Sequence, residues 1–254
     1  NVGGVKSEDL TVLLNAWVDT HDTGDVIYRS WLFDLSEGCV EKTGGRYPTH
    51  RYPNYVSQED PKYKATSSMT TLYEMDADAE RGAFYSISTA EELGFLAEYV
   101  NRGRNTKGAT FFLTCDMSII TKDAHYKGFY TGESWVPIGT SSANSFRGVF
   151  DGQGFVITEV LFGQKEDAPG LFGYLNDNDA IIKNIGVTGN VPDGETSGGI
   201  VCELIEGTIS NCWYSGNVYG DDYAGGIAGR VRDGNIENCV YFGTATSRDY
   251  AGGI

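Results

Sequence analysis

A 27-residue unit recurs in the C-terminal third of this chain, and it is the feature that most constrains the fold. An Ile-x-Asn element begins each unit and a Gly-Gly-Ile element follows it, and both keep the 27-residue spacing. The Ile-x-Asn elements occupy residues 182–184, 209–211 and 236–238, and the Gly-Gly-Ile elements occupy residues 198–200, 225–227 and 252–254. A fixed period of this size is typical of a solenoid, in which a unit cannot bury its own apolar face and stacks on its neighbours.

Within a unit the side chains alternate between the two sides of an extended backbone. Cys212 and Tyr214 fall on one side, and Trp213 and Ser215 fall on the other. A period of two indicates β-strands. Two or three short strands per unit, separated by Gly, Asn and Asp, predict parallel β-structure. A leucine-rich repeat, the nearest alternative in length, needs a Leu-x-x-Leu-x-Leu core that the repeat lacks. We therefore predict an all-β fold, a parallel β-helix with 27-residue coils.

The composition fits a folded, acidic and turn-rich protein. The chain has 254 residues, with 34 Gly, 6 Pro and a formal net charge of −16. The acidic balance argues against nucleic acid, because phosphate binding needs clustered Lys and Arg. No apolar run approaches the ~20 residues that span a bilayer, so we expect no membrane insertion. The chain begins without Met or a signal segment and stops within a repeat, and we expect a longer natural protein.

The five cysteines form no Cys-x-x-Cys pair and no zinc spacing. Cys212 and Cys239 are one repeat apart, so in stacked coils they would lie roughly 4.8 Å apart, within the Cα distance of a disulfide. In-register neighbours present their Cβ atoms side by side, however. We therefore interpret both residues as free, buried thiols that pack as small hydrophobes, and cysteine usage does not identify the compartment.

Residues 1–81 share nothing with the repeat and are predicted to form a small β-rich N-terminal domain. Residues 10–18 and 26–35 have the composition of two strands joined by a polar turn. Residues 46–55 are rich in Pro and Tyr and are predicted to form a loop. Its tyrosines either stack on sugar rings or pack on neighbouring structure. Residues 82–254 then form the second domain.

One helix is predicted, over residues 89–101. It begins with a capping box, in which the Thr89 hydroxyl and the Glu92 carboxylate satisfy each other's backbone donors. Its apolar positions make one stripe, consisting of Leu93, Leu96, Ala97 and Val100. A helix with one apolar face directly before a solenoid is expected to cap the open end of the stack. Residues 110–119 are predicted to form the first long strand.

Three motifs follow the helix in a fixed order. They are Trp-Val-Pro-Ile-Gly at 135–139, Phe-Asp-Gly-Gln-Gly at 150–154 and Gly-Leu-Phe-Gly at 170–173. With the helix and the glycine pairs, this order resembles the GLUG-motif proteins over residues 84–254. The resemblance implies bacterial secreted or surface-anchored proteins with a right-handed β-helix, often adhesin-like and built from several modules. It also implies a relation to β-helical regions that precede the protease domain of some immunoglobulin A peptidases, and it implies no catalytic residue.

Common catalytic motifs are missing from the sequence. It contains no His-Glu-x-x-His, no Gly-x-Ser-x-Gly and no Gly-x-x-x-x-Gly-Lys, and its histidines (His21, His50 and His125) are scattered. Residues 225–229 superficially resemble a nucleotide loop. The same glycine pair recurs one repeat earlier and one repeat later, which indicates a coil corner where the missing Cβ lets the backbone turn tightly.

One polar column of the repeat is predicted to be structural. Asn184, Asn211 and Asn238 occupy one position per coil. Stacked ~4.8 Å apart, their side-chain amides can hydrogen-bond along the column and satisfy a buried bend. We therefore predict an asparagine ladder.

A second column is the candidate ligand site. Glu195, Asp222 and Asp249 keep the same 27-residue spacing, and Tyr223 and Tyr250 follow the last two acids. One interpretation is a solvated polar loop. The other is a site in which carboxylates of successive coils bind Ca²⁺ and the tyrosines frame a sugar. No other cofactor is expected.

These patterns favour a non-enzymatic module at the cell surface or outside the cell. We predict an adhesin, a stalk or a binding surface for a host or microbial glycan or surface protein. The alternative is a polysaccharide lyase or glycosidase on a β-helix scaffold. A glycosidase needs two carboxylates about 5–10 Å apart in a groove. The constant 27-residue spacing leaves no long loops to build a deep cleft, which favours the binding module.

Overall fold

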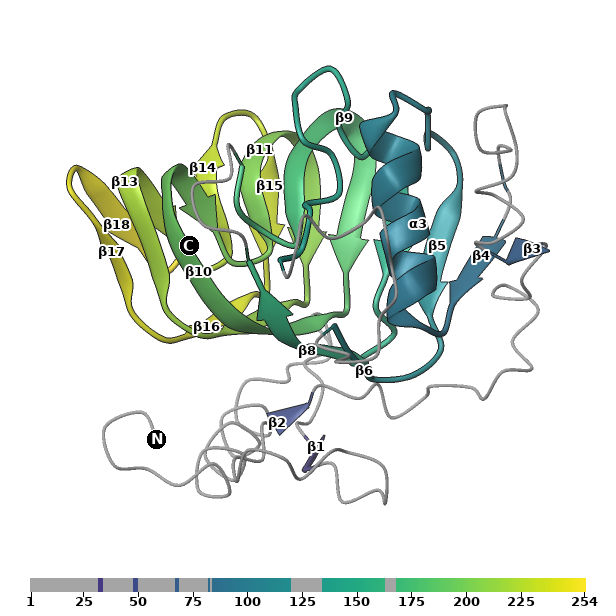
Figure 1. Cartoon of the computed structure of the whole chain (residues 1–254), viewed down its shortest axis with the longest axis horizontal. Helices are drawn as coiled ribbons and strands as arrows, with labels where there is room; N and C mark the ends of the chain where they lie inside the picture. Colours follow the sequence, from purple (N-terminus) through teal and green to yellow (C-terminus); the bar gives the residue numbers. More distant parts are fainter. Residues whose placement is uncertain are drawn as a thin grey trace, which may run out of the picture.

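The computed structural model describes residues 84–119, 134–162 and 168–254, with Gly82 and the backbone of three two-residue strands. The described residues from 84 onward form a parallel β-solenoid of about six turns with about 27 residues per turn (Figure 1). The elements in chain order are β1 (Leu32–Phe33), β2 (Pro48–Thr49), β3 (Ser67–Ser68), β4 (Phe84–Ile87), α3 (Ala90–Asn101), β5 (Thr110–Leu113), β6 (Met117–Ser118), β7 (Val149–Asp151), β8 (Val156–Leu161), β9 (Phe172–Lys183), β10 (Gly186–Gly198), β11 (Val201–Ser210), β12 (Trp213–Ser215), β13 (Val218–Gly225), β14 (Ala228–Val231), β15 (Asn235–Glu237), β16 (Val240–Phe242), β17 (Ala245–Ser247) and β18 (Tyr250–Gly252).

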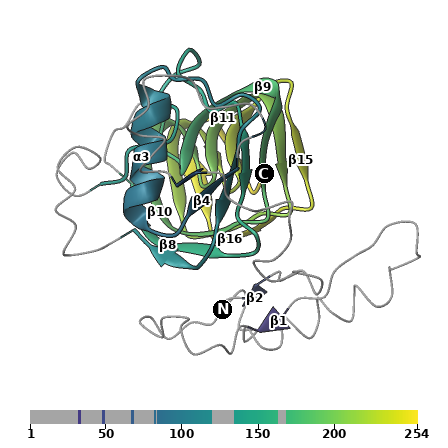
Figure 2. The same cartoon turned by 90° about the vertical axis from the view of Figure 1, so that its right-hand side faces the viewer.

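The coils build three walls around one core, and the strands within each wall are parallel (Figure 2). Wall 1 contains β3, β4, β5, β7, β9, β11, β14 and β15. Wall 2 contains β6, β8, β12, β16 and the start of β10, and wall 3 contains the end of β10 with β13, β17 and β18. The register advances by one repeat at each step, since Gly186 pairs with Trp213 and Trp213 pairs with Val240. The predicted parallel solenoid and its 27-residue period are confirmed.

Most of the predicted N-terminal features lie outside the described residues. This applies to the strand at 10–18 and to most of the strand at 26–35 and the loop at 46–55. Within these segments β1 pairs with β2 in antiparallel fashion. β3 pairs with β4 in parallel, so wall 1 begins before residue 82. The domain boundary at residue 82 stays a prediction.

The helix α3 forms where the sequence places it. The hydroxyl of Thr89 accepts the N–H of Glu92 at 3.2 Å, and the carboxylate of Glu92 accepts the N–H of Ser88 at 2.6 Å, one residue before the expected partner. The whole apolar stripe is buried in the core. Because α3 connects β4 to β5, which pair in parallel, it lies within the first coil rather than in front of the stack (Figure 1). Its role as a cap stays a prediction.

The predicted long strand at residues 110–119 is wrong in extent. The chain forms β5 in wall 1 and β6 in wall 2, with a corner at residues 114–116. β5 pairs with β7, whereas β6 pairs with β8. The apolar run continues through the corner because residues on both sides of it, Leu113 and Met117, are buried in the same core.

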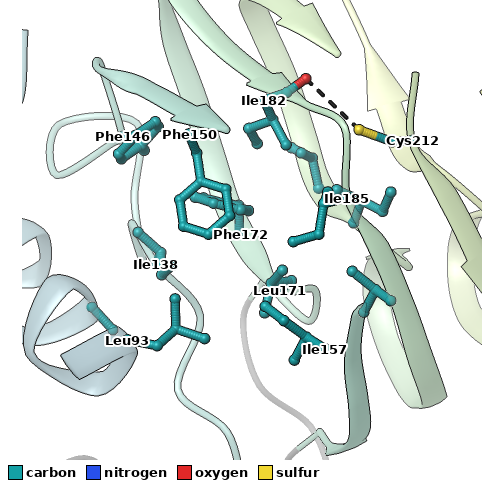
Figure 3. Packing of buried hydrophobic residues seen from close by; sticks show 14 of the residues in the cluster. Leu93, Ile138, Phe146, Phe150, Ile157, Leu171, Phe172, Ile182, Ile185 and Cys212 are labelled. Carbon is teal, nitrogen blue, oxygen red and sulfur yellow. Dashed lines mark hydrogen bonds between the residues drawn. The ribbon is translucent and has the colours of Figure 1, made fainter. Parts of the chain in front are cut away.

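Two of the three motifs that follow the helix meet on neighbouring coils. The carbonyl of Leu171 accepts the indole N–H of Trp135 at 3.0 Å and the N–H of Ile138 at 3.1 Å. All three side chains are buried, and Figure 3 shows Ile138, Leu171 and Phe172 in the same cluster. Burial of each such aliphatic side chain stabilises the fold by about 1.5–3 kcal/mol, so these motifs specify the core of the early coils.

The asparagine column forms the corner between walls 1 and 2. Asn184, Asn211 and Asn238 have φ of 58°, 54° and 51°, and Gln153 has φ of 53° at the same corner one coil earlier. These values lie in the left-handed region, which Asn tolerates better than most residues. Asn211 Nδ2 donates to Asn184 Oδ1 at 3.3 Å, and Asn184 Nδ2 donates to Asp151 Oδ1 at 2.9 Å. The column therefore combines left-handed backbone at the corner with hydrogen bonds between side-chain amides. This chain of hydrogen bonds ends on the carboxylate of Asp151.

The substitution Asn211→Leu should destabilise the fold by roughly 1–3 kcal/mol because the hydrogen bonds of the side-chain amide are lost. It should cost about 1–2 kcal/mol more because Leu is unfavourable in the left-handed backbone conformation of this position. Asn211→Gly separates the two effects, because Gly tolerates the backbone and lacks the amide. In urea unfolding, the wild type should be the most stable, Asn211→Gly intermediate and Asn211→Leu the least stable. A Leu variant as stable as the wild type would contradict both roles of Asn211.

The Gly-Gly-Ile element forms the corner between walls 3 and 1, as predicted, but tight turning does not explain its second glycine. Gly199 and Gly226 do not have left-handed φ. A Cβ on Gly199 would lie 2.3 Å from the carbonyl oxygen of Gly226 and 2.5 Å from the ring of Tyr214. A Cβ on Gly226 would lie 2.1 Å from the ring of Tyr241. Glycine is required because an inward tyrosine packs directly on its α-carbon.

Gly199→Ala should therefore destabilise the protein by about 1–3 kcal/mol, the usual cost of overpacking. Gly253→Ala is the matched control at the same repeat position, because its Cβ would lie 3.5 Å from the Tyr241 ring, an ordinary contact. Thermal unfolding should show a lower midpoint for the first variant and a midpoint near the wild type for the second. Equal midpoints for the two variants would show that the tyrosine contact does not constrain this corner.

Candidate functional site

The predicted acidic column lies on wall 3. Arg248 places a positive charge beside it, which the repeat pattern does not show. The guanidinium of Arg248 donates to Asp222 Oδ1 at 2.7 Å. This hydrogen bond raises the pKa of Arg248, and the charges of Asp222, Asp249 and Asp221 act in the same direction. The pair is exposed, so its contribution to stability is small. It nevertheless offsets part of the repulsion among the stacked acids.

The calcium interpretation of this column gains no geometric support. In the residues that the structure describes, no three His, Cys, Asp or Glu side chains come together as a group that could hold a metal ion. Glu195, Asp222 and Asp249 therefore do not form such a group. Calcium ordinarily takes 6–8 oxygen ligands, and Arg248 already donates to one of the carboxylates.

We expect that millimolar Ca²⁺ added to chelator-treated protein will leave the melting temperature unchanged, because Arg248 supplies the local counter-charge. Differential scanning fluorimetry with and without Ca²⁺ measures this. The variant Asp222→Asn serves as the control. A rise in melting temperature with Ca²⁺ in the wild type, but not in Asp222→Asn, would contradict this expectation and support the calcium interpretation.

The two tyrosines of the column form a stacked pair. The rings of Tyr223 and Tyr250 have centroids 5.2 Å apart and planes 11° apart, and the residues pair in register on β13 and β18. The guanidinium carbon of Arg230 lies 5.3 Å from the Tyr223 centroid. One face of each ring is thus covered by the other ring. Tyr250, which is 65% exposed, is the member of the pair that can contact a ligand.

Tyr219 is a third candidate, which the sequence analysis missed. It lies on β13 of the same wall and is 43% exposed. It alternates with Val218 and Gly220, both of which are buried. This alternation is visible in the sequence, but Tyr219 pairs with Thr246 and so belongs to no aromatic column. Wall 3 therefore exposes two tyrosines: Tyr219 on β13, the strand that also carries Asp222, and Tyr250 on β18.

A cavity of about 370 Å³ adjoins Asp249 and Tyr250. The rest of its lining consists of Ala224, Gly225, Ala228, Gly229, Ala251, Gly252 and Ile254. Asp249 and Tyr250 supply a carboxylate and a phenol that can hydrogen-bond a small hydroxyl-rich group.

A polar cluster on wall 2 was not predicted. Glu159 has φ of 56°, a left-handed value that is uncommon for Glu, and it sits at an irregularity between β8 and β10. Its carboxylate accepts the Ser118 hydroxyl at 2.7 Å, and its N–H donates to Thr188 Oγ1 at 3.1 Å. All three histidines lie outside the described residues. These contacts show how the irregularity between the two strands is held.

Among the residues that the structure describes, no helix has the length and apolar character needed to cross a bilayer.

The comparisons with known proteins support the fold. No family model matches the chain, and no curated protein matches it. A solved structure is similar, the crystal structure of a protein described as a "putative immunoglobulin A1 protease" from Bacteroides ovatus. The match has a TM-score of 0.52 and 23% sequence identity, and it covers 68% of this chain. The chain spans about half of the Bacteroides protein, 51% of its length. At this identity the likeness shows a shared β-solenoid fold.

Proposed function

We propose that residues 84–254 are a non-enzymatic module of a secreted or surface-anchored bacterial protein, acting as a stalk or a binding surface. The observation that carries the proposal is that repeated side chains contact their own copies in the next coil. Asn211 bonds to Asn184, and Tyr214 stacks on Tyr241 with centroids 6.1 Å apart. Side chains that hold each other in this way maintain a rigid scaffold and are not free to take part in catalysis.

The bacterial and extracellular parts of the proposal have separate support. The Bacteroides protein supports a bacterial source, and its printed description, a "putative immunoglobulin A1 protease", is compatible with action outside the cell. The three motifs after the helix support a GLUG-type module within a longer chain. We expect the solenoid to be right-handed, the hand that parallel crossover connections almost always adopt.

The proposed partner is a host or microbial glycan or a surface protein, and the proposed contact surface is wall 3. Tyrosine combines a broad apolar ring with a polar hydroxyl, and such a ring can lie on the apolar face of a sugar. Tyr219 and Tyr250 are the exposed rings of this wall. Asp249 and the Arg248–Asp222 pair supply hydrogen-bonding groups beside them.

A glycan array tests this proposal, with Tyr219→Ala and Tyr250→Ala as variants. Each variant should weaken binding by about tenfold or more, equivalent to ~1.4 kcal/mol. Tyr174→Ala, a partly exposed tyrosine on wall 1, is the matched control and should bind like the wild type. Binding that both wall 3 variants retain would remove wall 3 as the contact surface.

An assay for reducing-sugar release on acidic and neutral polysaccharides, run in parallel, addresses the polysaccharide lyase or glycosidase alternative. We expect no release above background. Release that depends on the intact chain and is lost in Asp249→Asn would instead establish an enzyme.

A further inference from the structure

Cys212 and Cys239 lie side by side on neighbouring coils. The N–H of Val240 donates to the carbonyl of Cys212 at 3.0 Å, and Trp213 pairs with Val240 in parallel register. The two cysteines therefore occupy one column of the solenoid. Cys212 belongs to the buried core, and Cys239 is partly buried and packs against that core. Both are free thiols in this structure.

The two thiols differ in access and in acidity. Cys212 is 1% exposed, whereas Cys239 is only partly covered. The Cys212 sulfur lies 3.1 Å from the Ser210 carbonyl and 3.8 Å from the Ile182 carbonyl (Figure 3), and the Cys239 sulfur lies 3.3 Å from the Glu237 carbonyl and 3.8 Å from the Ile209 carbonyl. Burial raises the pKa of Cys212, while the hydrogen bond from Cys212 lowers the pKa of Cys239. The accessible thiol is thus the one whose thiolate is stabilised.

We propose that Cys212 and Cys239 are an oxidation site, at which a small hydroperoxide converts the two thiols into a disulfide that links neighbouring coils. The Cys239 thiol loses its proton and the thiolate attacks one peroxide oxygen. The O–O bond breaks, the hydroxide that leaves takes up that proton, and the products are the sulfenic acid of Cys239 and water. The Cys212 sulfur then attacks the sulfenic sulfur, the S–O bond breaks, and hydroxide leaves as water with the Cys212 proton. Two thiols are oxidised, and one hydrogen peroxide is reduced to two waters.

The geometry allows the second step. Paired neighbours in a sheet have Cα atoms about 4.8 Å apart, inside the 4.4–6.8 Å range of disulfides. The Cβ atoms must approach to ~3.8 Å, which requires one coil to move. The two coils are therefore expected to lie closer together in the oxidised form than in the reduced form.

Two other cysteines provide internal controls. Burial raises the pKa of Cys202, which is almost fully buried. Burial also raises the pKa of Cys115, which is partly exposed. Neither thiol has the stabilised thiolate of Cys239, so both should react more slowly with peroxide. This inference does not depend on the proposed ligand.

The test treats the reduced full chain with hydrogen peroxide, blocks remaining thiols by alkylation and maps the peptides by mass spectrometry. Trypsin with a glutamate-specific protease separates Cys202, Cys212 and Cys239, because Glu203, Glu206 and Arg230 lie between them. We expect a cross-linked peptide pair containing Cys212 and Cys239, and a mass lower by two hydrogens. The melting temperature should rise by roughly 5 °C or more and return to its starting value with dithiothreitol.

Two variants separate the steps. Cys212→Ala should leave a sulfenic acid on Cys239 that dimedone traps, and Cys239→Ala should give neither cross-link nor adduct at Cys212. Cys202→Ala is the matched control and should keep the cross-link. The proposal is overturned if Cys115 or Cys202 is oxidised before Cys239, or if Cys239 passes to the sulfinic acid without joining Cys212.

Discussion

The whole structure depends on in-register hydrogen bonding between successive coils. The bonds run along the walls and through the asparagine corner, where the N–H of Asn184 donates to Ser210 at 3.1 Å and the N–H of Asn211 donates to Glu237 at 3.0 Å. A single coil has no partners for these backbone groups, so the stack forms as a unit. Where the offset between paired residues is 27, as from Ile209 to Ile236, a repeat position meets the same position in the next coil. Where both coils carry the same residue, its side chain must stack on a copy of itself.

The inward tyrosines show how this constraint acts in the core. Tyr214 and Tyr241 stack with centroids 6.1 Å apart, and their hydroxyls donate to the carbonyls of Gly189 and Gly216 at 2.9 and 3.0 Å. Burial raises the pKa of Tyr241 to about 12 and also raises that of Tyr214. The hydroxyls therefore stay protonated and remain donors at neutral pH. In each of these two coils the tyrosine hydroxyl thus has its hydrogen bond satisfied.

Sequence reasoning predicted the features that depend on the period and missed those that depend on local geometry. The spacing of Asn184 and Asn211 predicted their stacking, because equal offsets become neighbours in a solenoid. Their left-handed φ was missed, since no spacing reports a backbone angle. Arg248 was missed as the partner of Asp222 because it lies 26 residues away, one short of the period. The strand at residues 110–119 was overextended because an apolar run does not reveal a corner.

A further column, Asn190 with Asn217, could have been found from the sequence. The Asn190 side chain accepts the N–H of Asn217 at 2.9 Å, and the Asn217 side chain accepts the N–H of Thr244 at 3.3 Å. These residues also keep the 27-residue spacing. Two of the three corners of the coil thus use asparagine. At one corner the side-chain amides hydrogen-bond each other, and at the other the side-chain amide accepts a backbone N–H of the next coil. Such a scaffold leaves ligand contacts to the outward side chains of the walls.

Nuclear Overhauser contacts between backbone protons of residues one repeat apart test the central claim most directly. In a deuterated, amide-protonated sample, the account predicts contacts along wall 2 from Gly186 to Trp213 and from Trp213 to Val240, in the parallel pattern. Contacts at another offset, or in an antiparallel pattern, would contradict in-register stacking and with it the assignment of every column.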